Sequence, residues 1–493
     1  MATRRTVLGA ALVTAGTGAF TGAALTPLLG RSEKGQATSP AAQAAVPAGP
    51  PPIEKFKLAM PTMPVLAPSS TTDGVDRYVM TMRRARKEII PGFQTEVLTY
   101  NGHFPGPVIK ARTGRTVSVR QHNGIDMPTS VHLHGASVLP QDDGSPMETI
   151  APGANRTYTY PNKQPHASLW YHDHAHHMES EHVYRGLSGS YLITDPVEQA
   201  LPLPSGAYDV PIAVRDAAFD GQGQLRYAMN DFDGRTTVLA NGKAYPYFQV
   251  AARKYRFRFL NSANLRSFSL RLADGSELVQ IASDGGLLPK PHRTAEVPLS
   301  PGERADVVID FSRYPVGTRI VLENTNLGGG LPEDFGQVLR FDVVRTAADN
   351  SSVPAVLRTM PALPAPTAQR SVVMRMDESG AADALAFLND KVYDPNRIDE
   401  YVRHGASEVW TISNVNTFMP HNFHLHLVQF RVIERNGRPP AADEAGFKDT
   451  VWLMPGDTVK IQATFDTYRG QYLYHCHLID HSAMGMMGQF KIS

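Results

Sequence analysis

Cysteine is almost absent from this sequence: Cys476 is the only one in 493 residues. A lone cysteine cannot form an intramolecular disulfide, so its thiol is a small buried hydrophobe, a nucleophile or a metal ligand. An excess of charge is also absent, because the formal net charge is +1 and no long run has one sign. We therefore expect no binding to nucleic acid or to an anionic membrane surface.

Long amphipathic helices are not apparent either. Short segments such as "TVSVRQHN", "KYRFRFLN" and "EVWTISNVN" alternate with period two and are separated by Gly, Pro, Asn and Asp. This pattern predicts an all-β protein built from β-sandwiches. A chain of 493 residues is too long for one hydrophobic core, and its length suggests roughly three domains.

The N-terminus predicts export. Arg4 and Arg5 precede an uncharged run rich in Ala, Gly and Thr, as in a twin-arginine signal. The run is too weakly apolar to predict a stable membrane anchor. Residues 31–52 are rich in Ala, Pro and Gly, so we expect residues 1–52 to be a signal and a disordered spacer. The mature protein is then expected in the extracellular space or the cell envelope.

One sequence pattern occurs three times. "APGANRTYTYP", "SPGERADVVIDF" and "MPGDTVKIQATF" each place a Pro-Gly turn before an alternating strand, and "NGHFPGPVI" resembles "NGKAYPYFQV". These repeats predict three related sandwich domains. The predicted boundaries are 53–197, 198–347 and 371–493, with a linker at 348–370.

The first and third repeats each carry an H-x-H pair at the same offset from the turn. The middle repeat has Val321 and Glu323 at that offset, so the middle domain is predicted to bind no metal. Alternate residues of a strand face the same way, and each pair therefore aims two imidazoles at one point. The four pairs of the chain are His132 with His134, His172 with His174, His424 with His426, and His475 with His477.

Eight imidazoles are too many for one ion and predict three metals, of the kinds that imidazole prefers: copper, zinc or iron. A structural zinc site would need only four ligands, usually with more than one cysteine. Cys476 lies between two of the histidines and faces the opposite way, so it would bind a separate metal. With His421, His481 and Met486 it makes the ligand set of a blue-copper electron-transfer site.

The remaining histidines are expected to be hydrogen-bonded surface or core residues, although a weak local metal site at His176, His177 and His182 is an alternative. Met484 and Met487 are expected to pack rather than bind metal. The histidines in question are His103, His122, His166, His176, His177, His182, His292 and His404.

Taken together, H-x-H-G, W-Y-H-D-H, H-x-x-H-x-H and H-C-H-x3-H-x4-M resemble the four copper motifs of the multicopper oxidases, over roughly residues 55 to 493. "VYRGLSGSYLI" and "KYRFRFLNSAN" resemble the three-domain bacterial laccases of the spore-coat and bilirubin-oxidase type. The resemblance implies three cupredoxin-like Greek-key β-sandwich domains and four copper ions per chain.

The resemblance also implies a role for each clustered ligand. His421, Cys476, His481 and Met486 would hold the type 1 copper, and His132 and His424 the type 2 copper. The type 3 pair would be held by His134, His172, His174, His426, His475 and His477. A phenol or aminophenol would lose single electrons at the type 1 copper near His481, and O2 would be reduced to water at a trinuclear cluster between domains 1 and 3. Met419 and Asn422 are expected to shape the substrate rim.

Reduction of O2 to water needs four protons, so acids near the cluster matter. The resemblance points to Asp143, for which capping of an Asp-Gly turn is the alternative. Relatives of this type often carry a Glu directly after the type 1 histidine, where this chain has Ser482. Asp480, Asp173 or a water chain through Ser482 are the alternatives.

Three alternative functions predict other features of the sequence. A cuprous oxidase for copper tolerance usually has a Met-rich insert over the type 1 site, and none appears between 371 and 421. A metal-free export protein of this fold would lack most of the ligands. A two-domain copper nitrite reductase is excluded by the domain count. We expect a monomer whose partners are O2, a small aromatic reductant and the twin-arginine export machinery.

Overall fold

The computed structural model describes residues 49–326, 336–379 and 384–493. The predicted signal and nearly all of the predicted spacer lie outside these residues. Within them, strands form six sheets. No helix in the described ranges is long and apolar enough to cross a membrane.

The first two sheets come from residues 70–194 and share one apolar core, which includes Met80, Val119, Leu133 and Tyr191. One sheet has the order β1-β2-β5-β7 with β3 paired to β2, and the other has the order β4-β9-β8-β6. The strands are β1 (Ser70–Thr72), β2 (Val75–Glu88), β3 (Gln94–Tyr100), β4 (Gly106–Arg112), β5 (Thr116–Asn123), β6 (Val131–His134), β7 (Asn155–Tyr160), β8 (Ala167–Asp173) and β9 (Ser188–Thr194).

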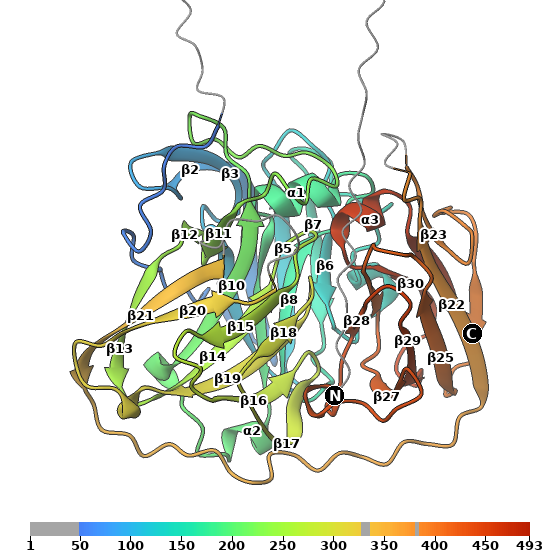
Figure 1. Cartoon of the computed structure of the whole chain (residues 1–493). Helices are drawn as coiled ribbons and strands as arrows, with labels where there is room; N and C mark the ends of the chain where they lie inside the picture. Colours follow the sequence, from blue (N-terminus) through green and yellow to red (C-terminus); the bar gives the residue numbers. More distant parts are fainter. Residues whose placement is uncertain (1–48, 327–335, 380–383) are drawn as a thin grey trace, which may run out of the picture. The chain divides into compact units, whose positions relative to one another are not determined.

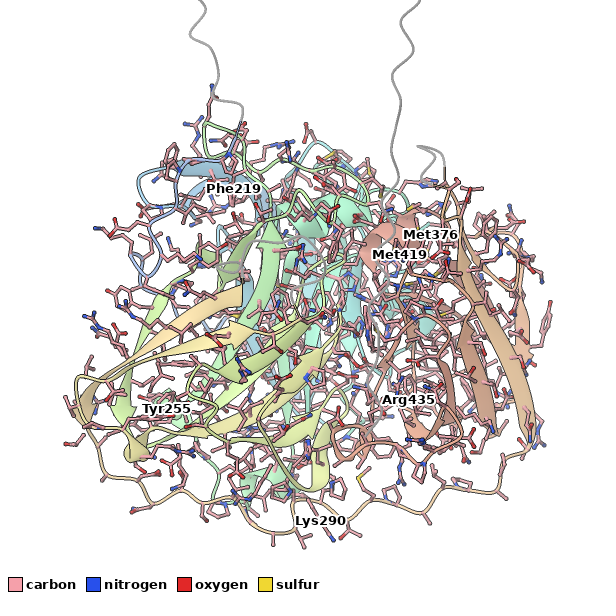
Figure 2. The ribbon with its side chains drawn as sticks, in the orientation of Figure 1. Phe219, Tyr255, Lys290, Met376, Met419 and Arg435 are labelled. Atoms are coloured by element: carbon pink, nitrogen blue, oxygen red, sulfur yellow. The ribbon has the colours of Figure 1, made fainter. Side chains whose placement is uncertain are left out.

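The next two sheets come from residues 209–346 and enclose a core rich in aromatic rings. Tyr255, labelled in Figure 2, stacks on Phe257 with ring centroids 5.7 Å apart. The sheet orders are β12-β11-β10-β14-β19-β16-β17 and β13-β21-β20-β15-β18. The strands are β10 (Asp209–Ala217), β11 (Thr237–Ala240), β12 (Lys243–Ala244), β13 (Tyr247–Ala252), β14 (Lys254–Asn261), β15 (Phe268–Leu272), β16 (Leu278–Ser283), β17 (Gly286–Thr294), β18 (Val297–Leu299), β19 (Arg304–Asp310), β20 (Arg319–Asn324) and β21 (Gln337–Thr346).

The last two sheets come from residues 368–492 and pack around Trp410, Phe423 and Phe490. One has the order β23-β22-β25-β29-β27, and its strands β22, β25 and β29 run side by side in Figure 1. The other has the order β24-β31-β30-β26-β28. The strands are β22 (Ala368–Met376), β23 (Ala386–Leu388), β24 (Glu400–Val402), β25 (Ser407–Asn414), β26 (His421–Leu425), β27 (Arg431–Arg435), β28 (Thr450–Leu453), β29 (Thr458–Thr464), β30 (Gly470–Cys476) and β31 (Met487–Ile492).

The threefold repeat recurs in the structure. Gly153, Gly302 and Gly456 have φ values of 77°, 85° and 81°, the left-handed region in which glycine is favoured. Each turn leads into an equivalent strand, β7, β19 or β29, and then into β8, β20 or β30. The predicted class of three β-sandwiches is confirmed. The domain boundaries stay predictions, and β22 begins slightly before the predicted start at residue 371.

The helices are short, and two of them follow strands that carry motif histidines. Helix α1 (Glu179–Arg185) comes after β8, and α3 (Ile479–Ala483) comes after β30. The two helices pack against each other (Figure 1). The other helical turns among the described residues are α2 (Pro196–Gln199), η1 (Pro140–Asp142), η2 (Gly206–Tyr208), η3 (Phe311–Arg313) and η5 (Ala442–Glu444).

Candidate metal centres

Eight imidazoles meet where the first sandwich faces the third. Strands β6 and β8, with the residue that follows β8, supply four of them, and β26 and β30 with their following residues supply the other four. Rings from the two sandwiches stack in pairs: His132 on His426 at 3.9 Å and His134 on His424 at 3.7 Å between centroids. All eight side chains are buried. The four H-x-H pairs therefore converge as predicted.

Nitrogen atoms within this histidine cluster are close enough for one metal to bridge. Two trios, His132 with His424 and His426, and His174 with His426 and His475, have ligand atoms within 4.8 Å of one another. The rings of His172 and His477 lie 5.3 Å apart, and that of His477 lies 4.6 Å from that of His134. The cluster can thus hold more than one ion.

The hydrogen bonds of these imidazoles leave nitrogens available to a metal. The Nδ1–H of His132 donates to the Asp143 carbonyl at 2.6 Å, and that of His424 donates to the Asp449 carbonyl at 2.7 Å. Their Nε2 atoms, like that of His172, have no hydrogen-bond partner among the described residues. Buried nitrogens are rarely left unpaired, and a metal-bound histidine usually donates its other N–H to a protein oxygen. The geometry fits metal-binding imidazoles.

Burial also keeps the imidazoles neutral. It lowers the pKa of His172 and of His424 to about 3 and that of His475 to about 4, because a charged ring loses its hydration inside the protein. A neutral imidazole offers a lone pair, so these rings are ready to bind metal at neutral pH.

Cys476 lies on the other face of β30, in a second cluster. Its Sγ atom is 3.7 Å from the Nδ1 atoms of both His421 and His481, and all three side chains form a potential metal site. The backbone N–H of Cys476 donates to the carbonyl of Met486, which is also buried. Burial raises the pKa of the Cys476 thiol to about 12, so a metal is needed to hold it as a thiolate.

Asp143 is placed against the histidine cluster by its backbone and its side chain. The Nδ1–H of His426 donates to Asp143 Oδ2 at 2.8 Å, while Oδ1 has no hydrogen-bond partner among the described residues and lies 3.6 Å from His132 Nδ1. Asp143 is therefore not a simple turn cap. Burial raises its pKa well above the usual range.

The sequence interpretation missed a buried ion pair beside the cluster. Arg304 donates to both oxygens of Asp449, at 2.7 and 2.6 Å, and Asp449 lies 3.5 Å from His134 Nδ1. Burial alone would raise the pKa of Asp449, but the Arg304 guanidinium holds it at about 2. Arg304 lies in the second Pro-Gly repeat, but the other two repeats have Asn155 and Thr458 at that offset, and Asp449 lies in no repeat. No spacing could therefore have predicted the pair.

The histidines outside the motifs behave differently. The His176 and His177 rings stack at 3.7 Å, and His182 Nδ1 lies 3.1 Å from Asp173 Oδ1. In the part of the chain that the structure describes, His176, His177 and His182 belong to no group of three potential ligands.

Three family models described as multicopper oxidase match residues 81–198, 168–325 and 364–493. With relatives above 30% identity over most of its length, the chain belongs to the multicopper oxidase family. It is 33% identical to a laccase of Bacillus subtilis over 90% of this chain and 99% of that protein. It is 36% identical to a bilirubin oxidase of Albifimbria verrucaria, over 88% of this chain and 81% of that protein.

Solved structures of multicopper oxidases have the same fold as this chain. A laccase from Pediococcus acidilactici superposes with a TM-score of 0.82 at 32% identity, over 90% of this chain and 95% of that chain. The predicted family, cupredoxin-like fold and enzyme class are thereby confirmed. The protein is a copper-dependent oxidase whose family binds type 1, type 2 and type 3 copper and uses O2.

Proposed function

We propose that this protein is a laccase-like oxidase that takes single electrons from phenols or aminophenols. The observation that carries the proposal is a cavity of about 520 Å³ beside the Cys476 cluster. Met419 and Pro420, which directly precede His421, line it, and so does Leu478, in the turn between Cys476 and His481. A substrate there would be separated from the cluster by only a few atoms.

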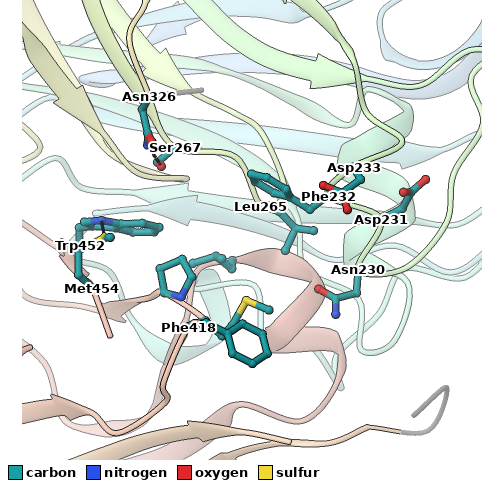
Figure 3. A pocket seen from close by; sticks show the side chains of 13 residues that line it. Asn230, Asp231, Phe232, Asp233, Leu265, Ser267, Asn326, Phe418, Trp452 and Met454 are labelled. Carbon is teal, nitrogen blue, oxygen red and sulfur yellow. Dashed lines mark hydrogen bonds between the residues drawn. The ribbon is translucent and has the colours of Figure 1, made fainter. Parts of the chain in front are cut away.

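The cavity suits a flat aromatic molecule. Phe418 and Trp452 of the third sandwich lie on one side, and Phe232 and Leu265 of the middle sandwich lie on the other (Figure 3). Its volume is that of an ordinary small-molecule site. Met419 lines the cavity as expected. Asn422 does not, because it is buried and donates to the Pro301 carbonyl at 2.7 Å.

The ligand roles follow the two clusters. We assign His421, Cys476, His481 and Met486 to type 1 copper, and His132 and His424 to type 2. The type 3 pair takes His134, His172, His174, His426, His475 and His477. Copper bound there would supply one-electron redox chemistry and the site of O2 reduction. The chain's own part is to receive electrons beside His481, to pass them along the covalent link from Cys476 to His475 and His477, and to hold protons at acids such as Asp143.

The comparison of two substrates tests this function. Copper-loaded protein is expected to oxidise 2,6-dimethoxyphenol with uptake of O2. The same preparation is then tested with Cu(I). A much higher kcat/KM for Cu(I) than for the phenol would reassign the protein as a cuprous oxidase. Protein that is purified from copper-replete cells without bound metal would reject both oxidase functions and favour the structural alternative.

We also propose export through the twin-arginine pathway and a monomeric state. Arg4 and Arg5 support the first, and a chain that carries all predicted ligands within itself supports the second. Replacing both arginines by lysine is expected to keep the protein in the cytoplasm. Unchanged export of that variant would contradict the assignment, and light scattering that gives a dimer mass would contradict the monomer.

A further inference from the structure

A buried carboxyl group on α1 belongs to neither metal cluster. Glu179 is the first residue of α1 and is 1% exposed. Its Oε1 atom lies 3.4 Å from the hydroxyl oxygen of Ser482 on α3, which can donate to it. Its Oε2 atom has no hydrogen-bond partner among the described residues. A buried carboxyl oxygen without a partner is costly in a structural role and marks a candidate for function.

Glu179 lies between the elements that build the two clusters. Helix α1 packs against β8, which carries His172, and against α3, which carries His481. Asp173, between His172 and His174 in the chain, is close enough to disfavour a negative charge on Glu179. The carboxyl group therefore sits close to the strand that supplies imidazoles to the histidine cluster.

Other nearby acids are held by firm partners. Asp449 is paired with Arg304 through both oxygens, and Asp480 accepts from Arg235 at 2.8 Å and from Asn264. Asp173 accepts from two backbone N–H groups and contacts His182. Both oxygens of each of these carboxyl groups therefore already have hydrogen-bond partners. Asp480 and Asp173 thus differ from Glu179, which has one carboxyl oxygen without a hydrogen-bond partner among the described residues.

Glu179 has the opposite environment. Burial raises its pKa to about 8, so the carboxyl group carries a proton at neutral pH. With Oε1 accepting from Ser482, the unpartnered Oε2 is the oxygen that can bear this proton. The ionisable groups on the elements packed around it are, from α1, β8, β3 and α3 in turn, Glu181, His182, Tyr184, Arg185, Tyr171, His172, Asp173, Glu96, Tyr100, Asp480 and His481. His177 and Tyr393 lie nearby in the connecting segments.

We propose that Glu179 is a proton donor for O2 reduction, reaching across from α1 to the place that Ser482 leaves without an acid. This inference rests on the proposed function. One O2 takes four electrons, from four one-electron substrate oxidations, and four protons to give two waters. Each proton that Glu179 gives up is replaced from solvent, which reaches the exposed His177 two residues before it.

The test uses copper-loaded enzyme and separates the two half-reactions. In the Glu179→Gln variant, which keeps the size of the side chain and an acceptor for Ser482, anaerobic reduction of the blue copper by 2,6-dimethoxyphenol is expected to stay within about twofold of wild type. Reoxidation of the reduced enzyme by O2 at pH 7 is expected to slow by about 100-fold or more, as for loss of a general acid. The matched control is Glu181→Gln, two residues along the same helix, where the glutamate is paired with Arg185 on the surface.

A second variant moves the acid instead of removing it. Because Glu179 and Ser482 are in contact, adding Ser482→Glu to Glu179→Gln returns a carboxyl group to the same place. The double variant is expected to recover at least a tenth of the wild-type reoxidation rate. A purely structural role for Glu179 would not be rescued in this way.

Infrared spectroscopy gives a readout that does not depend on turnover. Wild-type holoenzyme is expected to show a protonated-carboxyl band that fades as pH rises through about 8 and that Glu179→Gln lacks. Reoxidation of Glu179→Gln at the wild-type rate, or a wild type without this band, would overturn the inference. If Glu179→Gln does not fold, the wild-type titration decides alone. A wild type that binds no copper or consumes no O2 would instead refute the proposed function.

Discussion

The middle and third sandwiches repeat the same turn and strands, yet they serve the site in different ways. Strand β30 presents His475 and Cys476 to two metal clusters. The equivalent strand β20 presents Val321 and Glu323, and Glu323 forms a partly exposed ion pair with Arg271 at 3.2 Å. Both sandwiches have closed apolar cores. The sandwich fold therefore does not depend on the eight clustered imidazoles, which lie where the first sandwich meets the third.

The middle sandwich contributes charge instead of ligands. Arg304 on β19 holds Asp449 next to the histidine cluster, and Arg235 holds Asp480 next to His481. Both ion pairs are fully buried. In such surroundings a paired charge is fixed firmly, and an unpaired one is strongly destabilising. The middle sandwich thus supplies no metal ligand, but its arginines hold the carboxylates of Asp449 and Asp480 in place beside the two metal clusters.

The largest difference between the middle and third sandwiches is expected when the residue at the same offset of each repeat is replaced by glutamine. His477→Gln is expected to slow O2 consumption by about 100-fold or more, beyond the 10–100-fold typical of residues that only support a ligand. Glu323→Gln, at the same offset in the middle repeat, is expected to stay within about twofold, as a surface change does. Oxygen-electrode assays measure both. Equal losses in the two variants would show that the repeats do not differ as described.

Removing the ion pair between Arg304 and Asp449 should mainly lower the free energy of unfolding. Arg304→Gln leaves Asp449 buried without its guanidinium partner, and removing one member of a buried pair costs about 3–5 kcal/mol. We expect a clear fall of the Tm in calorimetry. Arg304→Gln combined with Asp449→Asn removes the stranded charge, so it should recover part of the loss. A single variant as stable as wild type would show that the pair does not hold the site.

The pH dependence of copper-free protein tests the buried imidazoles. The pKa values of His172 and His475 are lowered to about 3 and about 4 in the folded state, against 6.5 when exposed. As pH falls below about 6.5, the unfolded chain takes up protons first, so stability is full above that pH and declines toward pH 4. The Tm should therefore be lower at pH 5 than at pH 8. Equal values at the two pH values would contradict neutral, buried rings.

The smallest effects are expected at the substrate cavity, which the middle and third sandwiches share. Phe418→Ala, on the third, and Phe232→Ala, on the middle, are each expected to raise the KM for 2,6-dimethoxyphenol by less than about tenfold, or 1.4 kcal/mol. The blue absorption should not change. Unaltered KM values in both variants would place the phenol elsewhere.

The sequence was sufficient for the parts of the molecule that obey a spacing. Period-two alternation and the Pro-Gly turns predicted three sandwiches, and the H-x-H pairs predicted which rings converge, because side chains alternate strictly along a strand. The separation of Cys476 from its neighbours followed from the same rule.

The rest depends on contacts between distant segments. Arg304 and Asp449 are 145 residues apart, and Glu179 and Ser482 are 303 apart, so no local pattern relates them. Asn422 was misplaced for the same reason, since its hydrogen bonds reach Ser300 and Pro301 of another sandwich. Long-range charge pairs and hydrogen bonds depend on how the sandwiches pack against one another, and the residue pattern of a single strand does not predict that packing.

The most direct test of the two-cluster account is the visible spectrum of fully copper-loaded protein. The loaded protein should contain four coppers per chain, and its spectrum should show an intense band from a Cys476 thiolate bound to copper. The Cys476→Ser variant should lose that band while keeping the copper of the histidine cluster. A loaded wild type without the band, or a Cys476→Ser variant that retains it, would contradict the separation of one sulfur-bound metal from the imidazole-bound group.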